Sequence, residues 1–233
     1  MIRSACARAV LGVAVLAVGC APLSRPADPL SAEEHNDLGV AYYARGQHAL
    51  AAREFRRALA LRPAFTRALV NLGDAQLATG DVDGAIEAYE RARAASPEDP
   101  AIANNLAWAL LQHERRWPEA EPVIRGALAR RPEPRGYYLD TLGVLLLRKD
   151  HPGDALEAFR TALADRRLSD PQVRALVLRH TGEAHSRLGN PEAAERCYRL
   201  AQALSTLPRE PAGSGNAGRQ TPPPKVGQSD TVC

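Results

Sequence analysis

The side chains most able to bind a metal or attack a substrate are the six histidines and four cysteines. No two histidines are four residues apart, the spacing that places two imidazoles on one helix face for zinc, and no His-Glu-x-x-His motif occurs. There is also no Gly-x-Ser-x-Gly motif and no glycine-rich phosphate loop. The sequence therefore predicts no metal, no cofactor and no enzymatic activity.

The N-terminus has the composition of a signal peptide. A basic start with Arg3 and Arg8 precedes an apolar run of ten residues that ends at Val18. At about 1.5 Å per residue, this run is too short to cross a hydrocarbon layer of roughly 30 Å. Residues 1–19 are therefore predicted to be a signal peptide, which is removed from the mature protein.

The end of this segment, Leu16-Ala17-Val18-Gly19-Cys20, resembles the lipobox of bacterial lipoproteins. The resemblance implies that Cys20 is lipidated and becomes the first mature residue. Several acyl chains hold a protein firmly at a bilayer. Ala21 stands where inner-membrane lipoproteins of enteric bacteria have Asp, so the outer membrane, facing the periplasm, is expected. The alternatives are an ordinary cleaved signal, with Cys20 a bystander, and an uncleaved anchor.

The Pro-rich residues 20–31 are predicted to form a linker about 30 Å long between the lipid and the folded body. Cys197 and Cys233 are the other cysteines expected in the mature chain, because Cys6 leaves with the signal peptide. Two interpretations stay open for them. They form a disulfide in an oxidising compartment, or Cys197 is a small buried hydrophobe and Cys233 a thiol.

The body of the chain repeats itself. A small residue, which follows leucine in four of five cases, recurs at steps of 34, 34, 36 and 39. An alanine series recurs at steps of 34, 35, 35 and 39. An aromatic residue or isoleucine lies between them. The first series is Gly39, Gly73, Ala107, Gly143 and Gly182, the second is Ala51, Ala85, Ala120, Ala155 and Ala194, and the third is Phe55, Tyr89, Ile124, Phe159 and Tyr198.

Each series has a physical role. Small residues allow two antiparallel helices to approach within about 8 Å, and the aromatic ring fills the space that remains. Gly46, Gly80 and Gly189 are predicted to end first helices in the left-handed conformation. Pro63, Pro97 and Pro132 follow the second helices.

This pattern resembles the tetratricopeptide repeat (TPR) family over residues 32–208. The resemblance implies an all-α solenoid of about five helix-turn-helix repeats in a right-handed superhelix. The expected repeats are residues 32–65, 66–99, 100–134, 136–169 and 175–208. Ser31 with Glu34, and Asp99 with Pro100, are expected to start helices. Pro118 is expected to open a second helix. The last repeat is expected to have about one and a half extra helical turns, from Asp170 and Pro171, before the pattern resumes near Ala175.

The last second helix has apolar residues at Leu200, Ala203, Leu204 and Leu207 with no helix after it to cover them. Either the tail folds back over this face or another chain covers it, and a homo-oligomer is one such contact. Residues 209–233 are rich in Gly, Pro and Ser and are predicted to be a disordered tail. Between Cys20 and Pro208 the chain has 25 basic and 25 acidic residues, so no nucleic-acid partner is expected.

In TPR proteins the first helix of each repeat lines the concave face. Amide groups that bond a peptide backbone, beside flat aromatic anchors, suit a protein or peptide partner. For Asn71 and Asn105 a structural role is the alternative, and for Trp108 inter-repeat packing is the alternative. The predicted groove residues are Asn36, Tyr43, Arg67, Asn71, Asp74, Asn104, Asn105, Trp108, Tyr137, Asp140, Arg179 and Glu183.

These features favour a non-enzymatic adaptor, tethered to the membrane by lipid, that holds a polypeptide partner in the bacterial cell envelope. Among known families it resembles the TPR lipoproteins of pilus, secretion or exopolysaccharide systems. Two alternatives stay open: an escort of a secretin, like the type IV pilus pilotins, and a periplasmic regulator that docks cell-wall hydrolases or proteases.

Overall fold

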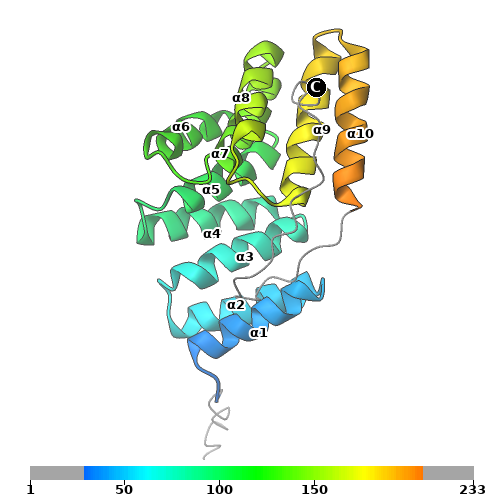
Figure 1. Cartoon of the computed structure of the whole chain (residues 1–233). Helices are drawn as coiled ribbons and strands as arrows, with labels where there is room; N and C mark the ends of the chain where they lie inside the picture. Colours follow the sequence, from blue (N-terminus) through cyan, green and yellow to red (C-terminus); the bar gives the residue numbers. More distant parts are fainter. Residues whose placement is uncertain (1–28, 207–233) are drawn as a thin grey trace, which may run out of the picture.

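The computed structural model describes residues 29–206, and in that range the chain forms ten α-helices, one short 3-10 helix and no strand (Figure 1). The helices are α1 (Ala32–Ala44), α2 (His48–Leu61), α3 (Thr66–Ala78), α4 (Val82–Ala95), α5 (Pro100–Gln112), η1 (Trp117–Glu119), α6 (Ala120–Ala129), α7 (Gly136–Arg148), α8 (Pro152–Ala164), α9 (Pro171–Arg187) and α10 (Pro191–Ser205). The all-α prediction is confirmed. The predicted signal peptide, Cys20, most of the linker and the tail from 209 onward lie outside the described residues.

The helices stack in chain order into an elongated array (Figure 1). Each helix packs against the helices next to it in sequence, and α1 with α3, α5 with α7 and α7 with α9 also contact one another. The odd-numbered helices are the first helices of the five repeats and the even-numbered helices are the second. The apolar core is therefore divided into layers between neighbouring repeats, as in a solenoid.

Several helices begin where their capping residues predict. The Ser31 hydroxyl accepts from the backbone N–H of Glu34 at 3.2 Å, and the Glu34 carboxylate accepts from the backbone N–H of Ser31 at 2.8 Å. Asp99 caps α5 and Asp170 caps α9, each ahead of a proline at the first helical position. Because the extra turns at Pro171 join the fifth repeat without a break, α9 is 17 residues long.

One turn differs from the sequence prediction, and another closes without glycine. Pro118 does not open the second helix of repeat three; it lies in η1, and α6 begins at Ala120. Gly46, Gly80 and Gly189 have the expected positive φ, but in repeat four Asp150 holds that place, with φ of 62°. Aspartate tolerates the left-handed region better than most residues with a Cβ, so this turn closes without glycine.

The small residues and the aromatic rings are fitted to each other. A Cβ added at Gly39 would lie 2.5 Å from Cε1 of Phe55, and one added at Gly73 would lie 2.6 Å from Cε1 of Tyr89. In repeat three the small residue is Ala107, and the ring is replaced by Ile124, which is fully buried. The extra methyl group and the smaller partner therefore compensate each other within one repeat.

Two arginines join neighbouring repeats at equivalent places. Nη1 of Arg148, in the last turn of α7, donates to the carbonyl oxygen of Leu111 in α5. Nη1 of Arg187, in the last turn of α9, donates to the carbonyl oxygen of Leu147 in α7 at 2.6 Å. Charged side chains here satisfy carbonyl groups that the helix end leaves without an intrahelical partner.

Candidate binding groove

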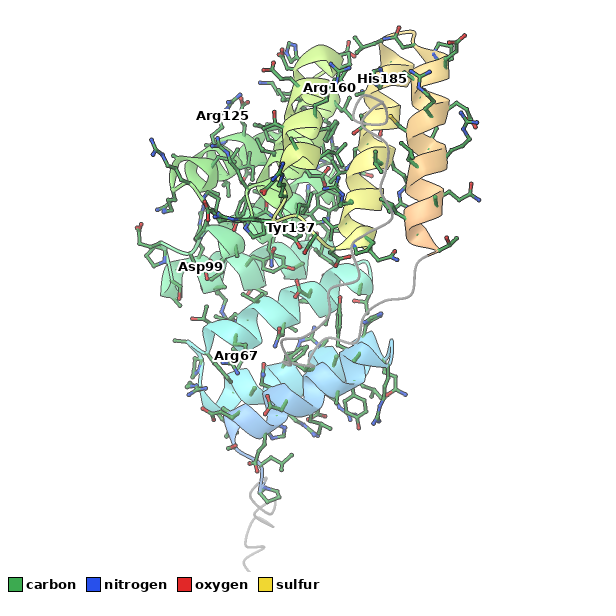
Figure 2. The ribbon with its side chains drawn as sticks, viewed as in Figure 1. Arg67, Asp99, Arg125, Tyr137, Arg160 and His185 are labelled. Carbon is green, nitrogen blue, oxygen red and sulfur yellow. The ribbon has the colours of Figure 1, made fainter. Side chains whose placement is uncertain are left out.

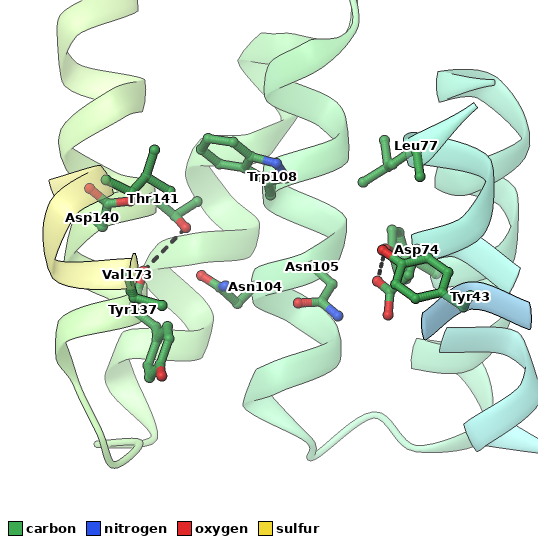
Figure 3. A pocket seen from close by; sticks show the side chains of 13 residues that line it. Tyr43, Asp74, Leu77, Asn104, Asn105, Trp108, Tyr137, Asp140, Thr141 and Val173 are labelled. Carbon is green, nitrogen blue, oxygen red and sulfur yellow. Dashed lines mark hydrogen bonds between the residues drawn. The ribbon is translucent and has the colours of Figure 1, made fainter. Parts of the chain in front are cut away.

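A hollow of about 500 Å³ runs along the first helices of all five repeats (Figure 3). Its walls are mainly apolar and aromatic, and its polar groups are two carboxylates, two amides, four hydroxyls and one indole N–H. The lining residues are Tyr43, Asp74, Leu77, Ala78, Tyr89, Asn104, Asn105, Trp108, Tyr137, Asp140, Thr141, Val173 and Leu176. We call this hollow the inner groove.

Seven of the twelve residues that the sequence places in a groove line this hollow. They are Tyr43, Asp74, Asn104, Asn105, Trp108, Tyr137 and Asp140. Repeat spacing brings them together because each occupies the same inner face of a first helix. By contrast, Arg125 and Arg160 belong to second helices and are exposed away from the inner groove (Figure 2).

The other five predicted residues are elsewhere. Asn36 is 1% exposed, and its Oδ1 accepts a hydrogen bond from Nδ2 of Asn71 at 2.8 Å. The placement of Asn36 in the groove is therefore wrong, because this amide is buried and joins α1 to α3. Asn71 is half-buried in the same bond, which agrees with the structural alternative for it.

The remaining three are charged residues outside the lining. Arg67 and Arg179 are exposed, and Glu183 forms an ion pair with Arg187 at 2.6 Å on α9. None of the three lies among the residues that line the inner groove. Their role in binding stays a prediction.

Asp74 and Tyr89 form a largely buried polar contact in the groove wall. The Tyr89 hydroxyl donates to Oδ1 of Asp74 at 2.5 Å (Figure 3). Burial raises the pKa of Asp74, although the bond from Tyr89 acts in the opposite direction. Burial and the Asp74 carboxylate likewise raise the pKa of Tyr89. The phenol therefore stays protonated and remains the donor.

At the other end of the groove, Asp140 pairs with a histidine from the next repeat. Oδ1 of Asp140 lies 2.8 Å from Nδ1 of His180, and both side chains are largely buried. The ring of His180 also lies 5.7 Å, centroid to centroid, from Phe159 in the core. This contact fixes α9 against α7 beside the groove.

Trp108, on α5, contacts both the inner groove and the apolar core. It is half-buried, lines the inner groove, and packs against the core cluster of repeats two to five. Its ring centroid is 6.3 Å from that of His180. The two interpretations of Trp108, groove and packing, are therefore both consistent with its position.

The side-chain amide of Asn104, in the middle of the groove, has an oxygen without a hydrogen-bond donor in the described chain. Among the residues that the structure describes, no group donates to Oδ1 of Asn104, which is buried in the groove wall. Asn104 occupies the repeat position that Asn36 and Asp140 occupy, and both of those bond across to the next repeat. Its neighbour in the next repeat is Thr141, whose hydroxyl donates instead to the carbonyl oxygen of Tyr137.

Sequence reasoning missed several lining residues. Tyr89 belongs to a second helix, and its hydroxyl bonds to Asp74 in the groove wall. The signal for it was a tyrosine where Phe55 and Phe159 stand in other repeats. A buried tyrosine usually needs an acceptor for its hydroxyl. Val173 lies in the extra turns of α9, where the repeat spacing no longer indicates which face a residue occupies.

The described residues show no group of three or more histidine, cysteine or carboxylate side chains arranged to hold a metal ion. Of the helices in residues 29–206, none is both long enough and apolar enough to span a bilayer. Cys197 is fully buried in the small cluster between α9 and α10, while Cys233 lies outside the described range.

Five stacked helix pairs with a continuous inner groove define a helical-repeat scaffold for protein interaction. The chain belongs to the tetratricopeptide repeat family. The family profile matches four overlapping segments, residues 36–100, 70–134, 104–170 and 141–208, and so covers the whole helical array. This family fold is typically a non-catalytic scaffold for binding proteins.

Solved structures show the same fold. MamA from strain MSR-1 matches at 22% identity and a TM-score of 0.54, over 75% of this chain and 96% of that chain. Pseudomonas aeruginosa PilF matches at 22% identity and a TM-score of 0.61, over 74% of this chain and 76% of that chain. A chain of the hetero-tetramer Cut9-Hcn1 matches at 21% identity and a TM-score of 0.67, over 76% of this chain but 34% of that chain. A search of curated proteins found no significant match.

Proposed function

We propose that this chain is an adaptor that holds a segment of a polypeptide partner in its inner groove. The observation that carries the proposal is the groove itself, which draws lining residues from the first helices of all five repeats. Tyr43, Trp108 and Tyr137 offer flat apolar surfaces, and Asn104 and Asn105 offer amides that can bond a peptide backbone. An extended segment fits such a surface better than a small compact ligand does.

We further propose that the adaptor works in the bacterial cell envelope, tethered by lipid at Cys20 to the outer membrane and facing the periplasm. The support is the lipobox-like segment that ends at Cys20. Assembly of a pilus, a secretion apparatus or an exopolysaccharide system is the process we favour. The similarity to PilF, at 22% identity, supports the fold and does not select among these systems.

Site-specific crosslinking in intact membranes tests the adaptor. A photoreactive amino acid at Tyr137, inside the groove, should capture a defined polypeptide, whereas the same group at Arg125, on the outer side, should not (Figure 2). If both sites capture the same set of proteins, the groove is not the binding surface. A captured secretin would favour the pilotin-like alternative, and a captured cell-wall hydrolase or protease would favour the regulator.

Cys20→Ser tests the tether separately. Without the thiol no lipid can be attached, so the variant should move from the membrane fraction to the soluble fraction when cells are broken. Cys197→Ser is the matched control, because this cysteine is buried in the folded body. If the Cys20 variant stays in the membrane fraction, the lipid anchor is the wrong explanation.

A further inference from the structure

The ionisable acid and base groups that line the inner groove are carboxylates, without a basic partner in the lining. Asp74 and Asp140 are the charged residues of the lining, and no lining residue within 29–206 is basic. Each carboxylate has one hydrogen-bond partner in the described chain, Tyr89 for Asp74 and His180 for Asp140, although a carboxylate offers about four acceptor sites. Oδ1 of Asn104 is a third acceptor that no described group satisfies.

Aromatic rings stand beside these acceptors. Tyr43 lies next to Asp74, Trp108 lies between Asp74 and Asp140, and Tyr137 lies at the Asp140 end (Figure 3). The faces of aromatic rings attract cations, most strongly at sites withdrawn from water. Burial and the negative charge of Asp74 raise the pKa of Tyr43, and burial raises the pKa of Asp74 itself. A cation in the groove would offset the cost of keeping Asp74 ionised there.

The apolar residues of the groove wall indicate which side chains the ligand has besides its charged ones. Leu77 lies at the Asp74 end, and Val173 and Leu176 lie at the Asp140 end. Figure 3 shows Asp74 and Asp140 on opposite sides of the Asn104, Asn105 and Trp108 group. The two negative charges are therefore separated by a stretch that is aromatic and amide in character.

We infer that the groove selects a basic segment of its partner: an extended stretch with two arginine or lysine side chains, one paired with Asp74 and the other with Asp140, separated by apolar residues that contact Trp108. This inference rests on the proposed function and names the chemistry of the partner. Guanidinium and ammonium groups supply several N–H donors to each carboxylate, together with the positive charge that the lining residues do not provide. An acidic segment would instead meet like charge in a partly desolvated site.

Peptide selection tests the inference. The full chain, kept in detergent, is used to select binders from a library of random short peptides displayed on phage. The bound pool should be enriched in peptides with two basic residues around an apolar stretch. For the strongest such peptide, Asp74→Asn with Asp140→Asn should weaken binding by about tenfold or more, because a buried charge partner is lost. Replacing both basic residues of the peptide by neutral citrulline should weaken it similarly.

The matched control is Glu87→Gln with Glu157→Gln. It removes the same charge from exposed positions on α4 and α8, outside the lining, and should change affinity less than twofold. Circular dichroism must show that both double variants stay folded, since asparagine keeps the shape of each aspartate. A lower melting temperature of the aspartate variant would reflect the altered contact with His180, so binding is compared at a temperature where both variants are fully folded. Binding that falls equally in the control would show long-range attraction and would overturn the pairing with Asp74 and Asp140.

The other outcomes separate the inference from the proposed function. If the selected peptides bind in the groove but are neutral or acidic, the basic specificity is wrong and the adaptor stands. If nothing is selected with the full chain or with a chain ending at Pro208, the adaptor itself is wrong. If peptides are selected only after residues 209–233 are removed, the occupant is the chain's own tail, with Arg209, Arg219 and Lys225, and the inference of a separate partner fails.

Discussion

Gly39→Ala is expected to destabilise the protein although alanine is the better helix former. The new Cβ would lie 2.5, 2.7 and 3.0 Å from three ring atoms of Phe55, where carbon atoms normally approach to about 3.5–4.0 Å. Phe55 is 1% exposed, so its ring cannot simply turn into solvent. Overpacking of this kind costs about 1–3 kcal/mol, and the helix propensity of alanine returns up to about 1 kcal/mol. A net loss of about 1–2 kcal/mol is expected.

The third repeat suggests the compensating change. Phe55→Ile in the Gly39→Ala background copies the Ala107 and Ile124 pair. Phe55→Ile alone should cost about 1–2 kcal/mol, because it leaves space beside Gly39. The double variant should cost no more than Phe55→Ile alone, since the added methyl group occupies part of that space. The coupling between the two sites is then about 1–2 kcal/mol in favour of the pair.

Urea unfolding followed by far-UV circular dichroism measures all three variants. Gly126→Ala is the control: a Cβ there meets nothing within 4 Å, so this helical glycine should gain up to about 1 kcal/mol. The size-matching argument is refuted if Gly39→Ala is as stabilising as the control. It is also refuted if the double variant loses the sum of the single losses within about 0.5 kcal/mol.

The other predictions concern the groove, one inter-repeat bond and one buried pair. Trp108→Ala should weaken binding of a groove peptide by about tenfold or more, while the melting temperature falls by a few degrees. Trp117→Ala is the control, because Trp117 is outside the lining. A large drop in melting temperature with unchanged binding would assign Trp108 to packing. Asn71→Ala leaves Oδ1 of Asn36 buried without its donor and should cost about 1–3 kcal/mol in urea unfolding, whereas a neutral result would contradict the structural role of Asn36. Glu54 is 1% exposed, and although its burial acts to raise its pKa, hydrogen bonds from His35, Arg57 and Arg53 bring the pKa below the ordinary value. The ionised Glu54 carboxylate therefore stabilises the fold above the ordinary glutamate pKa, and this stabilisation is lost as the pH falls through the lowered pKa of the folded state. The difference in unfolding free energy between wild type and Glu54→Gln should narrow below about pH 4. A difference that stays constant with pH would count against an ionised Glu54 in the folded protein.

Residues with fixed places in the repeat were predictable from the sequence. Gly39 and Phe55 meet as the spacing indicates, and Gly46 ends α1 in the left-handed conformation. Inner-face residues such as Trp108 and Asp140 were found for the same reason, because a repeat fixes which face of a helix each position occupies.

Depth and cross-repeat bonding were harder to predict. Asn36 has the same repeat position as Asn104, yet the first is buried by its bond to Asn71 and the second borders the groove. What differs is the residue opposite in the next repeat, and spacing along one chain does not show which side chains meet across repeats. The partnership of His180 with Asp140 was missed for this reason, since the long α9 changes the step between repeats.

The arginine bonds of the later repeats have a mechanical consequence. Arg148 and Arg187 attach the last turns of α7 and α9 to the preceding first helices, while the equivalent places in α3 and α5 are Ala78 and Gln112, for which the described chain shows no such bond. Bending stiffness should therefore rise from the N-terminal to the C-terminal half of the array. A ligand that requires a different curvature of the array would be accommodated by distortion of α1 to α4. Without ligand, the backbone amides of α1 to α4 should exchange with deuterium faster than those of α7 to α10.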